Sequence, residues 1–190
     1  MTQRILTIMR HATATLVSDR DHNRALTPLG LDEARSVGQR MLDRGEEPDR
    51  IFASTALRCR QTRDALCAGL GYEIETEFEG ALYNASAESL LDALAVQDEP
   101  GSLLLLAHNP GVSMLAIGLC TGQKTRTGVS SPGGSEADAS QAENPLHPQW
   151  RRMQGGFAPA STARFEVRAS WPELAAHTTR FLGFEEPPAP

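Results

Sequence analysis

The sequence predicts an α/β domain in which helices cover both faces of a mostly parallel sheet. Short apolar runs of strand length alternate along the chain with longer amphipathic stretches. One of these runs contains four consecutive leucines, Leu103 to Leu106, as expected for a strand that is buried on both faces. A chain of 190 residues fits a single domain, residues 1–190, with three α/β/α layers.

The composition excludes several classes of protein. A net charge of -6 argues against general nucleic-acid binding. No apolar run approaches the ~20 residues of a membrane span, and the N-terminus lacks a signal-peptide pattern, so we expect a cytoplasmic protein. The three cysteines are odd in number and form no C-x-x-C pair, which argues against a disulfide framework or a zinc site.

The first half of the chain contains two strand–helix pairs. Ile5–Met9 is the first predicted strand, and residues 12–26 form a long loop of the kind that often carries function. Thr27 and Pro28 then predict the start of a helix that ends at Gly45. The next elements are a strand over Arg50–Ala53 and a helix over Ala56–Leu70, which Gly71 closes.

The remaining elements follow the same alternation. A short strand over Tyr72–Glu77 precedes a helix over Ser86–Val96, and the strand Ser102–Ala107 precedes a helix over Val112–Cys120. Residues 121–156 are rich in Gly, Ser, Pro and charge and predict a flexible insertion. The last predicted elements are a strand over Ser161–Ala169, a short helix or turn over Trp171–Leu174, and a frayed tail from Glu186.

Cationic and imidazole side chains follow three of the predicted strands. Arg10 and His11 end the first strand, Arg58 lies in the first turn of the helix after the second, and His108 follows the leucine run. Ligands in open α/β sheets bind at the carboxyl ends of strands. If these strands are neighbours, we expect the four side chains to converge at one edge of the sheet.

Such a cluster suits phosphoryl chemistry. A guanidinium binds phosphate oxygens bidentately and stays charged at physiological pH. An imidazole can act as a covalent nucleophile, and it is largely neutral near pH 7. Phosphoryl transfer mainly needs positioning and charge stabilisation, which two arginines and two histidines offer without a metal.

Four segments resemble motifs of the histidine phosphatase superfamily. Arg10-His11-Ala12 is similar to its Arg-His-Gly motif, and Ser54 to Thr62 is similar to its Ser-Pro-x-x-Arg-x-x-Gln-Thr segment. Leu105 to Pro110 resembles its late histidine segment. Asp21 to Thr27 is similar to a stretch of the small branch that contains the SixA phosphohistidine phosphatases. The four segments occur in the family's order, over about residues 4 to 120.

The resemblance implies a phosphoglycerate mutase-like fold and assigns roles to residues. His11 is the implied nucleophile, which becomes phosphohistidine, and His108 completes the pocket. Arg10 and Arg58 bind the phosphoryl group, and Arg24 adds a contact from the loop. The chain departs from the family in two places: Ala12 replaces the motif glycine, which costs energy only if its φ is positive, and Thr55 replaces a proline.

The proton donor for the leaving group is the weakest assignment. Asp21 is the first choice, because it pairs with Arg24 in the small-branch pattern. Three glutamates are alternatives: Glu77, Glu79 and Glu88. Without a strong acid, the site suits substrates with good leaving groups, such as phosphohistidine and acyl phosphates.

The sequence thus predicts a phosphatase that needs no cofactor and acts through a phosphohistidine intermediate. Its substrate is a phosphoprotein or a phosphorylated small molecule, and we expect a monomer or weak dimer. The alternative is a domain that binds phosphorylated ligands with little or no turnover. A rival phosphatase signature, C-x5-R from Cys120 to Arg126, lies at the end of a predicted helix and is therefore not favoured. The other histidines, His22, His147 and His177, are expected at the surface.

Overall fold

The computed structural model describes residues 4–97, 101–121 and 148–187. In these ranges a single sheet has the strand order β3-β2-β4-β1-β5-β6. The first four strands in this order run parallel, β5 is antiparallel to β1, and β6 is antiparallel to β5, so the prediction of a mostly parallel sheet is confirmed. The strands are β1 (Arg4–Arg10), β2 (Arg50–Ser54), β3 (Glu75–Glu79), β4 (Ser102–Ala107), β5 (Thr162–Val167) and β6 (Thr179–Glu185).

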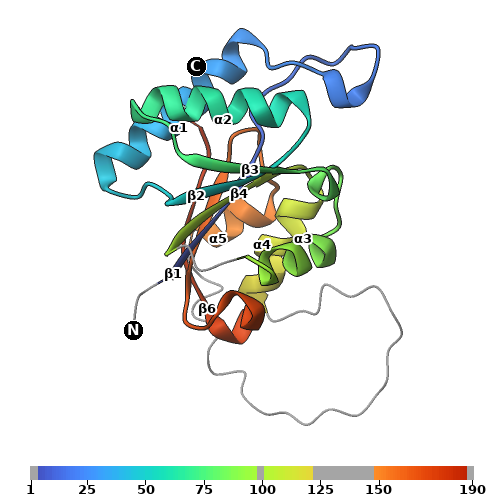
Figure 1. Cartoon of the computed structure of the whole chain (residues 1–190). Helices are drawn as coiled ribbons and strands as arrows, with labels where there is room; N and C mark the ends of the chain where they lie inside the picture. Colours follow the sequence, from blue (N-terminus) through green and yellow to red (C-terminus); the bar gives the residue numbers. More distant parts are fainter. Residues whose placement is uncertain (1–3, 98–100, 122–147, 188–190) are drawn as a thin grey trace.

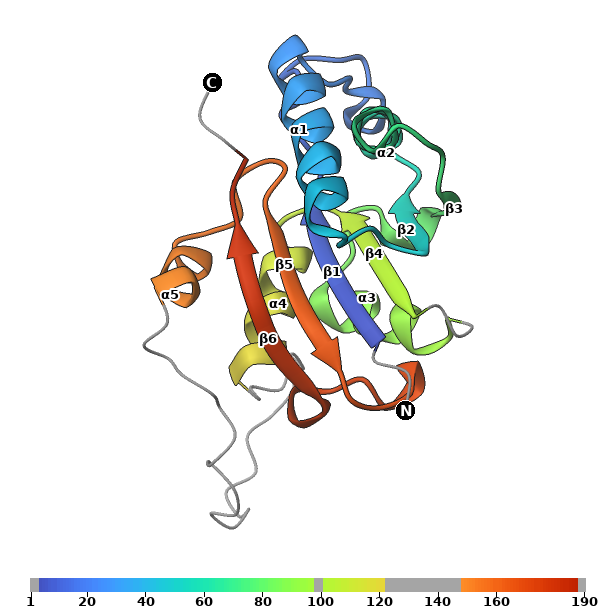
Figure 2. The ribbon, with the colours of Figure 1, turned by 90° about the vertical axis from the view of Figure 1, so that its left-hand side faces the viewer.

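Helices cover the two faces of the sheet in three layers. On one face lie α1 (Pro28–Arg44) and α2 (Leu57–Leu70), above the sheet in Figure 1. On the other lie α3 (Ala87–Ala95), α4 (Gly111–Thr121) and α5 (Pro148–Gln154). Figure 2, turned by 90°, shows the same separation, with α3 and α4 behind the strands and α5 beside the edge strand β6.

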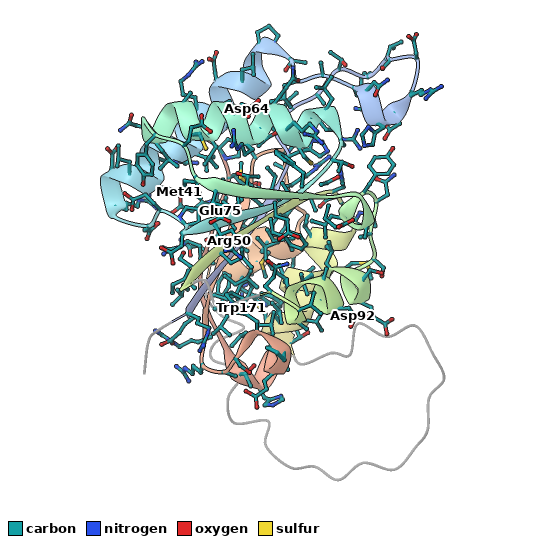
Figure 3. The ribbon with its side chains drawn as sticks, in the orientation of Figure 1. Met41, Arg50, Asp64, Glu75, Asp92 and Trp171 are labelled. Carbon is teal, nitrogen blue, oxygen red and sulfur yellow. The ribbon has the colours of Figure 1, made fainter. Side chains whose placement is uncertain are left out.

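The leucine run of β4 explains why both faces need a cover. Leu103 and Leu105 pack into the core that α3, α4 and α5 complete, whereas Leu104 and Leu106 pack into the core under α1 and α2. Successive side chains of a strand point to opposite faces, so an unbroken apolar run requires two apolar layers. Trp171, labelled in Figure 3, is fully buried in the first of these cores.

The helix ends follow local sequence signals. Thr27 caps α1 by accepting a hydrogen bond from the Gly30 backbone N–H, and Ser86 caps α3 in the same way with Ser89. Gly45 and Gly71 end α1 and α2 in the left-handed conformation that glycine adopts without steric cost. The bounds predicted for these helices are therefore confirmed to within a residue or two.

The structure differs from the sequence prediction at the edges of the sheet. β3 begins at Glu75 rather than at Tyr72, because its register is set by pairing with β2; Arg50 faces Glu75 there, as Figure 3 shows. β6 was not predicted at all. Its conformation depends on pairing with β5 across a register shift, which the sequence of β6 alone does not indicate.

The predicted insertion over residues 121–156 lies mostly outside the described residues, which stop at 121 and resume at 148. Its described end is not flexible loop but helix α5, which packs against β6. Trp150 and Met153 of α5 are buried in the core shared with α3 and α4. In the described parts of the chain, no helix is both long enough and apolar enough to cross a membrane.

Close contact between α1 and α2 depends on two glycines. A Cβ atom at Gly38 would lie 2.1 Å from the carbonyl oxygen of Leu66, and one at Gly69 would lie 2.0 Å from that of Arg35. Each glycine therefore lets the backbone of the other helix approach. Because the opposing atoms belong to helix backbones, they cannot move aside as a flexible side chain would.

We expect Gly38→Ala and Gly69→Ala each to lower the free energy of unfolding by about 1–3 kcal/mol, the usual cost of overpacking. Urea unfolding followed by circular dichroism measures this loss. Gly80→Ala is the matched control, because a Cβ atom there has no neighbour within 4 Å among the described residues. Equal stability of all three variants would contradict this account of the helix contact.

Candidate active site

The strand order brings the predicted site residues to one edge of the sheet. β4 lies between β1 and β2, with Arg10 opposite Ala107 and Ala53 opposite Leu106. The carboxyl ends of the three strands are therefore level and adjacent. His11, Ser54 and His108 follow or end these strands, so the polar residues that the sequence singled out do converge.

The ring of His11 has a defined tautomer. Its Nδ1 lies 2.8 Å from the carbonyl oxygen of Ala12, and its Nε2 lies 3.2 Å from Nε of Arg58. A carbonyl oxygen only accepts and a guanidinium N–H only donates. Nδ1 therefore carries the proton, and the lone pair of Nε2 faces Arg58. The two contacts agree on the same tautomer, in which Nε2 is the unprotonated nitrogen.

Arg58 lies at the second position of α2 and is 3% exposed. Besides the contact of its Nε with His11, its Nη1 donates to the backbone oxygen of Asp21 at 2.7 Å. Its Nη2 donates to the carboxylate Oδ2 of Asp21 at 3.1 Å. One guanidinium thus contacts the His11 ring at its Nε end and the carboxylate of Asp21 at its Nη2 end.

The ring of His108 lies next to that of His11, with the ring centroids 5.1 Å apart and the planes tilted by 60°. Its Nε2 lies 2.8 Å from the hydroxyl of Ser54 and 3.7 Å from the thiol of Cys59. Its buried Nδ1 has no hydrogen-bond partner within the described ranges. Because the Ser54 hydroxyl can donate to Nε2, the ring can hold its proton on Nδ1, as an N–H donor for a phosphoryl oxygen.

Arg10 and Arg24 add two further positive charges near Arg58. Nη1 of Arg10 donates to the backbone oxygen of Phe157 at 2.7 Å, and the side-chain amide of Asn109 donates to the same oxygen at 3.0 Å. Arg24 donates to the backbone oxygen of Thr15 and to Oδ1 of Asp21. The pKa of Arg10 is lowered by burial and by the charges of Arg24 and Arg58, which lie close to it.

Asp21 is surrounded by donors. Its carboxylate accepts hydrogen bonds from Arg24, Arg58 and the hydroxyl of Tyr83. These contacts, that with Tyr83 first, hold the pKa of Asp21 well below its usual range. The group is therefore an anion at physiological pH, which argues against the predicted role of Asp21 as the proton donor. Its carboxylate instead takes up donors of Arg58 that an incoming phosphate would need.

The long loop over residues 12–26 is tied to α2 at both ends. The hydroxyl of Thr62 accepts from the backbone N–H of Ala12 at 3.1 Å, and Gln61 accepts from that of Leu26 at 2.7 Å. The loop lies beyond the N-terminal end of α2 in Figure 1. Ala12 is not among the described non-glycine residues with positive φ, so its methyl group causes no backbone strain where the family has glycine.

Two further side chains, Tyr83 and His22, lie beside Asp21 and His108 and form with Asp21 the rim of the site. Neither of them was identified as a site residue from the sequence. The ring of Tyr83 lies edge-on to that of His108, with centroids 5.4 Å apart, and its hydroxyl donates to Asp21. His22, expected at the surface without partners, contacts Tyr83 and the hydroxyl of Thr55. Neither residue lies at a strand end, and Tyr83 follows a short 3-10 helix over Gly80–Leu82, so no local pattern marks them.

The three glutamates considered as proton donors lie on β3 and α3. Glu77 and Glu79 are exposed on β3, and Glu79 accepts from the backbone N–H of Ala81. Glu88 lies in the first turn of α3. Cys120 of the rival C-x5-R signature lies within α4, and burial raises its pKa to about 12, whereas Arg126 lies outside the described residues. That signature therefore lacks the reactive thiolate that its chemistry needs.

Both histidines of the pocket are held neutral. Burial, reinforced by the charge of Arg58, lowers the pKa of His11 to about 4 and that of His108 to about 3. Within the described residues, no group of three or more His, Cys, Asp or Glu side chains is placed to hold a metal ion. The site is thus a buried arrangement of cations and neutral imidazoles on a protein with an overall charge of -6.

Fold and site together define a phosphate-binding α/β enzyme in which histidine supplies the nucleophile. The sequence profile of the histidine phosphatase superfamily (branch 1) matches residues 6–82. The phosphohistidine phosphatase SixA of Escherichia coli is 31% identical over 119 residues, which cover 61% of this chain and 74% of SixA. The chain therefore belongs to the histidine phosphatase superfamily and is a phosphatase.

Two further relatives match almost the whole chain. An uncharacterized protein of Mycobacterium tuberculosis is 28% identical over 181 residues, covering 94% of this chain and 99% of that protein. A solved structure from Nakamurella multipartitia, described as a candidate SixA phosphohistidine phosphatase, has a TM-score of 0.77 at 26% identity and covers 98% of each chain. The phosphoglycerate mutase-like fold that the resemblance implied is confirmed.

The lowered pKa of His11 predicts how stability depends on pH. The unfolded state binds a proton near the ordinary pKa of about 6.5, whereas the folded state resists it down to about 4. The contribution of the neutral His11 to the free energy of unfolding is therefore fully present above pH 6.5 and is lost as the pH drops toward 4. We expect His11→Gln to flatten this decrease, measured as free energies of urea unfolding at pH 7 and pH 5 in phosphate-free buffer. An unchanged slope would contradict the neutral, buried state of His11.

The contact between Asp21 and Arg58 predicts competition with phosphate. Asp21→Asn removes the competing charge, so we expect orthophosphate to bind up to about 10-fold more tightly, the scale of a half-exposed ion pair. Isothermal titration calorimetry measures the change. Asp19→Asn is the matched control, because it removes the same charge from an exposed residue of the same loop. An equal gain in phosphate affinity in both variants would show that the change in net charge, and not the contact with Arg58, is the cause.

Proposed function

We propose that His11 is the nucleophile of this phosphatase and that Nε2 attacks the phosphorus atom. The observation that carries the proposal is the hydrogen bond from Arg58 Nε to His11 Nε2, at 3.2 Å. This contact supports an arrangement in which a phosphoryl group bound to Arg58 lies within reach of the unprotonated Nε2 of His11. The lowered pKa of His11 supports the same role, because the ring is ready to attack without a base.

Arg10, Arg58 and Arg24 are proposed to bind the phosphoryl group, with His108 donating from Nδ1. The group carries two negative charges, and charge accumulates on its oxygens during transfer. Arg58 and His108 are buried, so their interactions with those oxygens are screened little by water. Asp21, an anion that neutralises Arg58 and Arg24, is proposed to give way to the substrate.

The proposed reaction has two steps and needs no metal ion. The His11–phosphorus bond forms while the bond to the leaving group breaks, which leaves phosphohistidine. Water then attacks the phosphorus, the bond to His11 breaks, and phosphate is released. The substrate class that we propose is a phosphohistidine of a protein, which rests on the likeness to E. coli SixA and on a rim whose Asp21 side chain is 47% exposed. Cytoplasmic location and a monomer or weak dimer stay predictions from the sequence.

The test is hydrolysis of p-nitrophenyl phosphate in the presence of EDTA. We expect wild-type turnover to persist and His11→Ala to lower kcat by about 10³-fold or more, the effect of removing a nucleophile. His177→Ala is the matched control. His177 is exposed beside the start of β6, at the opposite end of the sheet, since Thr179 pairs with Val167 and Val167 with Arg4.

Two results would contradict the proposal. A His11→Ala variant that keeps wild-type turnover would exclude His11 as the nucleophile. Binding of vanadate without turnover would favour the phospho-ligand-binding domain. A protein phosphorylated on histidine, compared with a phosphoserine peptide at equal concentration, tests the substrate class: we expect the phosphohistidine to be hydrolysed faster.

A further inference from the structure

The side chain of Tyr83 lies against Asp21, at the end of Arg58 that is remote from His11. Its hydroxyl donates to Oδ2 of Asp21 at 2.6 Å, and that same oxygen accepts from Nη2 of Arg58 at 3.1 Å. The Cζ atom of Arg58 lies 5.7 Å from the centroid of the Tyr83 ring. His11, in contrast, contacts Arg58 at Nε. Nucleophile and phenol thus approach one guanidinium from its two ends.

The proton between Tyr83 and Asp21 belongs to Tyr83. The hydrogen bond to Asp21, together with burial, raises the pKa of the phenol above its ordinary value of 10. The same hydrogen bond lowers the pKa of Asp21. At physiological pH the pair is therefore a neutral phenol and a carboxylate. Of these two groups, only the phenol has a proton to give.

A phosphoryl group on Arg58 changes the surroundings of that phenol. It competes with the carboxylate of Asp21 for Nη2, and Asp21 is the acceptor of the Tyr83 O–H. When Asp21 gives way, the phenol loses its acceptor. In an in-line displacement the leaving atom lies opposite the nucleophile. With His11 at the Nε end, the leaving atom points toward the end where Tyr83 stands.

We propose that Tyr83 is the proton donor to the leaving group, and this rests on the proposed function of His11. In the first step the His11–phosphorus bond forms, the bond from phosphorus to the leaving atom breaks, and the phenolic proton moves to that atom. In the second step water attacks phosphorus, its proton returns to the phenolate of Tyr83, and the bond to His11 breaks. Phosphate leaves, and both side chains regain their starting protonation.

The ring of Tyr83 is held independently of the hydroxyl. It packs edge-on to His22 and His108, with centroids 5.0 Å and 5.4 Å away. Tyr83→Phe therefore removes the proton but keeps these contacts, which makes it a sharp test. A proton donor matters in proportion to the basicity of the leaving group, so its loss has little effect on a good leaving group and a large effect on a poor one.

The experiment compares p-nitrophenyl phosphate, whose leaving group needs no proton, with phenyl and alkyl phosphates. We expect Tyr83→Phe to lower kcat/KM for an alkyl phosphate by about 10²-fold or more, the usual contribution of general acid catalysis. For p-nitrophenyl phosphate we expect little change. His22→Gln is the control variant, because His22 contacts the ring of Tyr83 rather than its hydroxyl; it should not steepen the dependence on the leaving group.

A second variant keeps the hydroxyl. Replacing Tyr83 by 3-fluorotyrosine lowers the phenolic pKa, so the basic limb of the pH profile for an alkyl phosphate should move to lower pH by a similar amount. Its failure to move would overturn the proposal. So would an equal loss of activity on all substrates in Tyr83→Phe, or a leaving-group effect of the same size in His22→Gln. Absence of His11-dependent turnover in the wild type would overturn the proposed function as well, which separates the two failures.

Discussion

The guanidinium of Arg58 is the group on which the arrangement of the pocket depends. It is buried, it donates to Nε2 of His11, and it holds both the backbone and the carboxylate of Asp21. Its charge helps to lower the pKa of His11 and His108, so both rings stay neutral. A buried cation is costly unless it is paired, and Asp21 supplies the partner. The pairing with phosphate and the pairing with Asp21 therefore use the same donors.

The position of Arg58 follows from how α2 is anchored. The helix packs against α1 through the reciprocal contacts of Gly38 and Gly69, so its axis is fixed close to its neighbour. Gln61 and Thr62, on the turn after Arg58, bind the two ends of the loop that contains Asp21. The residues that hold the two ends of this loop and the arginine that pairs with Asp21 thus belong to the same helix. The packing of α2 against α1 therefore also constrains the geometry of the site.

The pocket has an inner part and a rim with different charge. The inner part consists of the half-buried Arg10, the buried Arg58 and the two buried, neutral histidines, where low exposure strengthens interactions with an anion. The rim carries Asp21, Tyr83 and His22, which interact with one another and with Arg58. This division explains how an acidic protein presents a site for phosphate. In the reaction that we propose, it also separates binding of the phosphoryl group from proton transfer to the leaving group.

The sequence by itself determined what depends on neighbours along the chain. The caps of α1 and α3, the glycine ends of α1 and α2, and the apolar run of β4 are local signals, and each placed its element. The strand ends also placed His11, Arg58 and His108, because adjacent parallel strands end at one edge. Only the tertiary structure decided β6, α5, the tautomer of His11 and the place of Tyr83 beside Asp21. Each of these depends on contacts between residues far apart in the chain, for which no local pattern exists. Asp21 and Tyr83, for example, are separated by 62 positions.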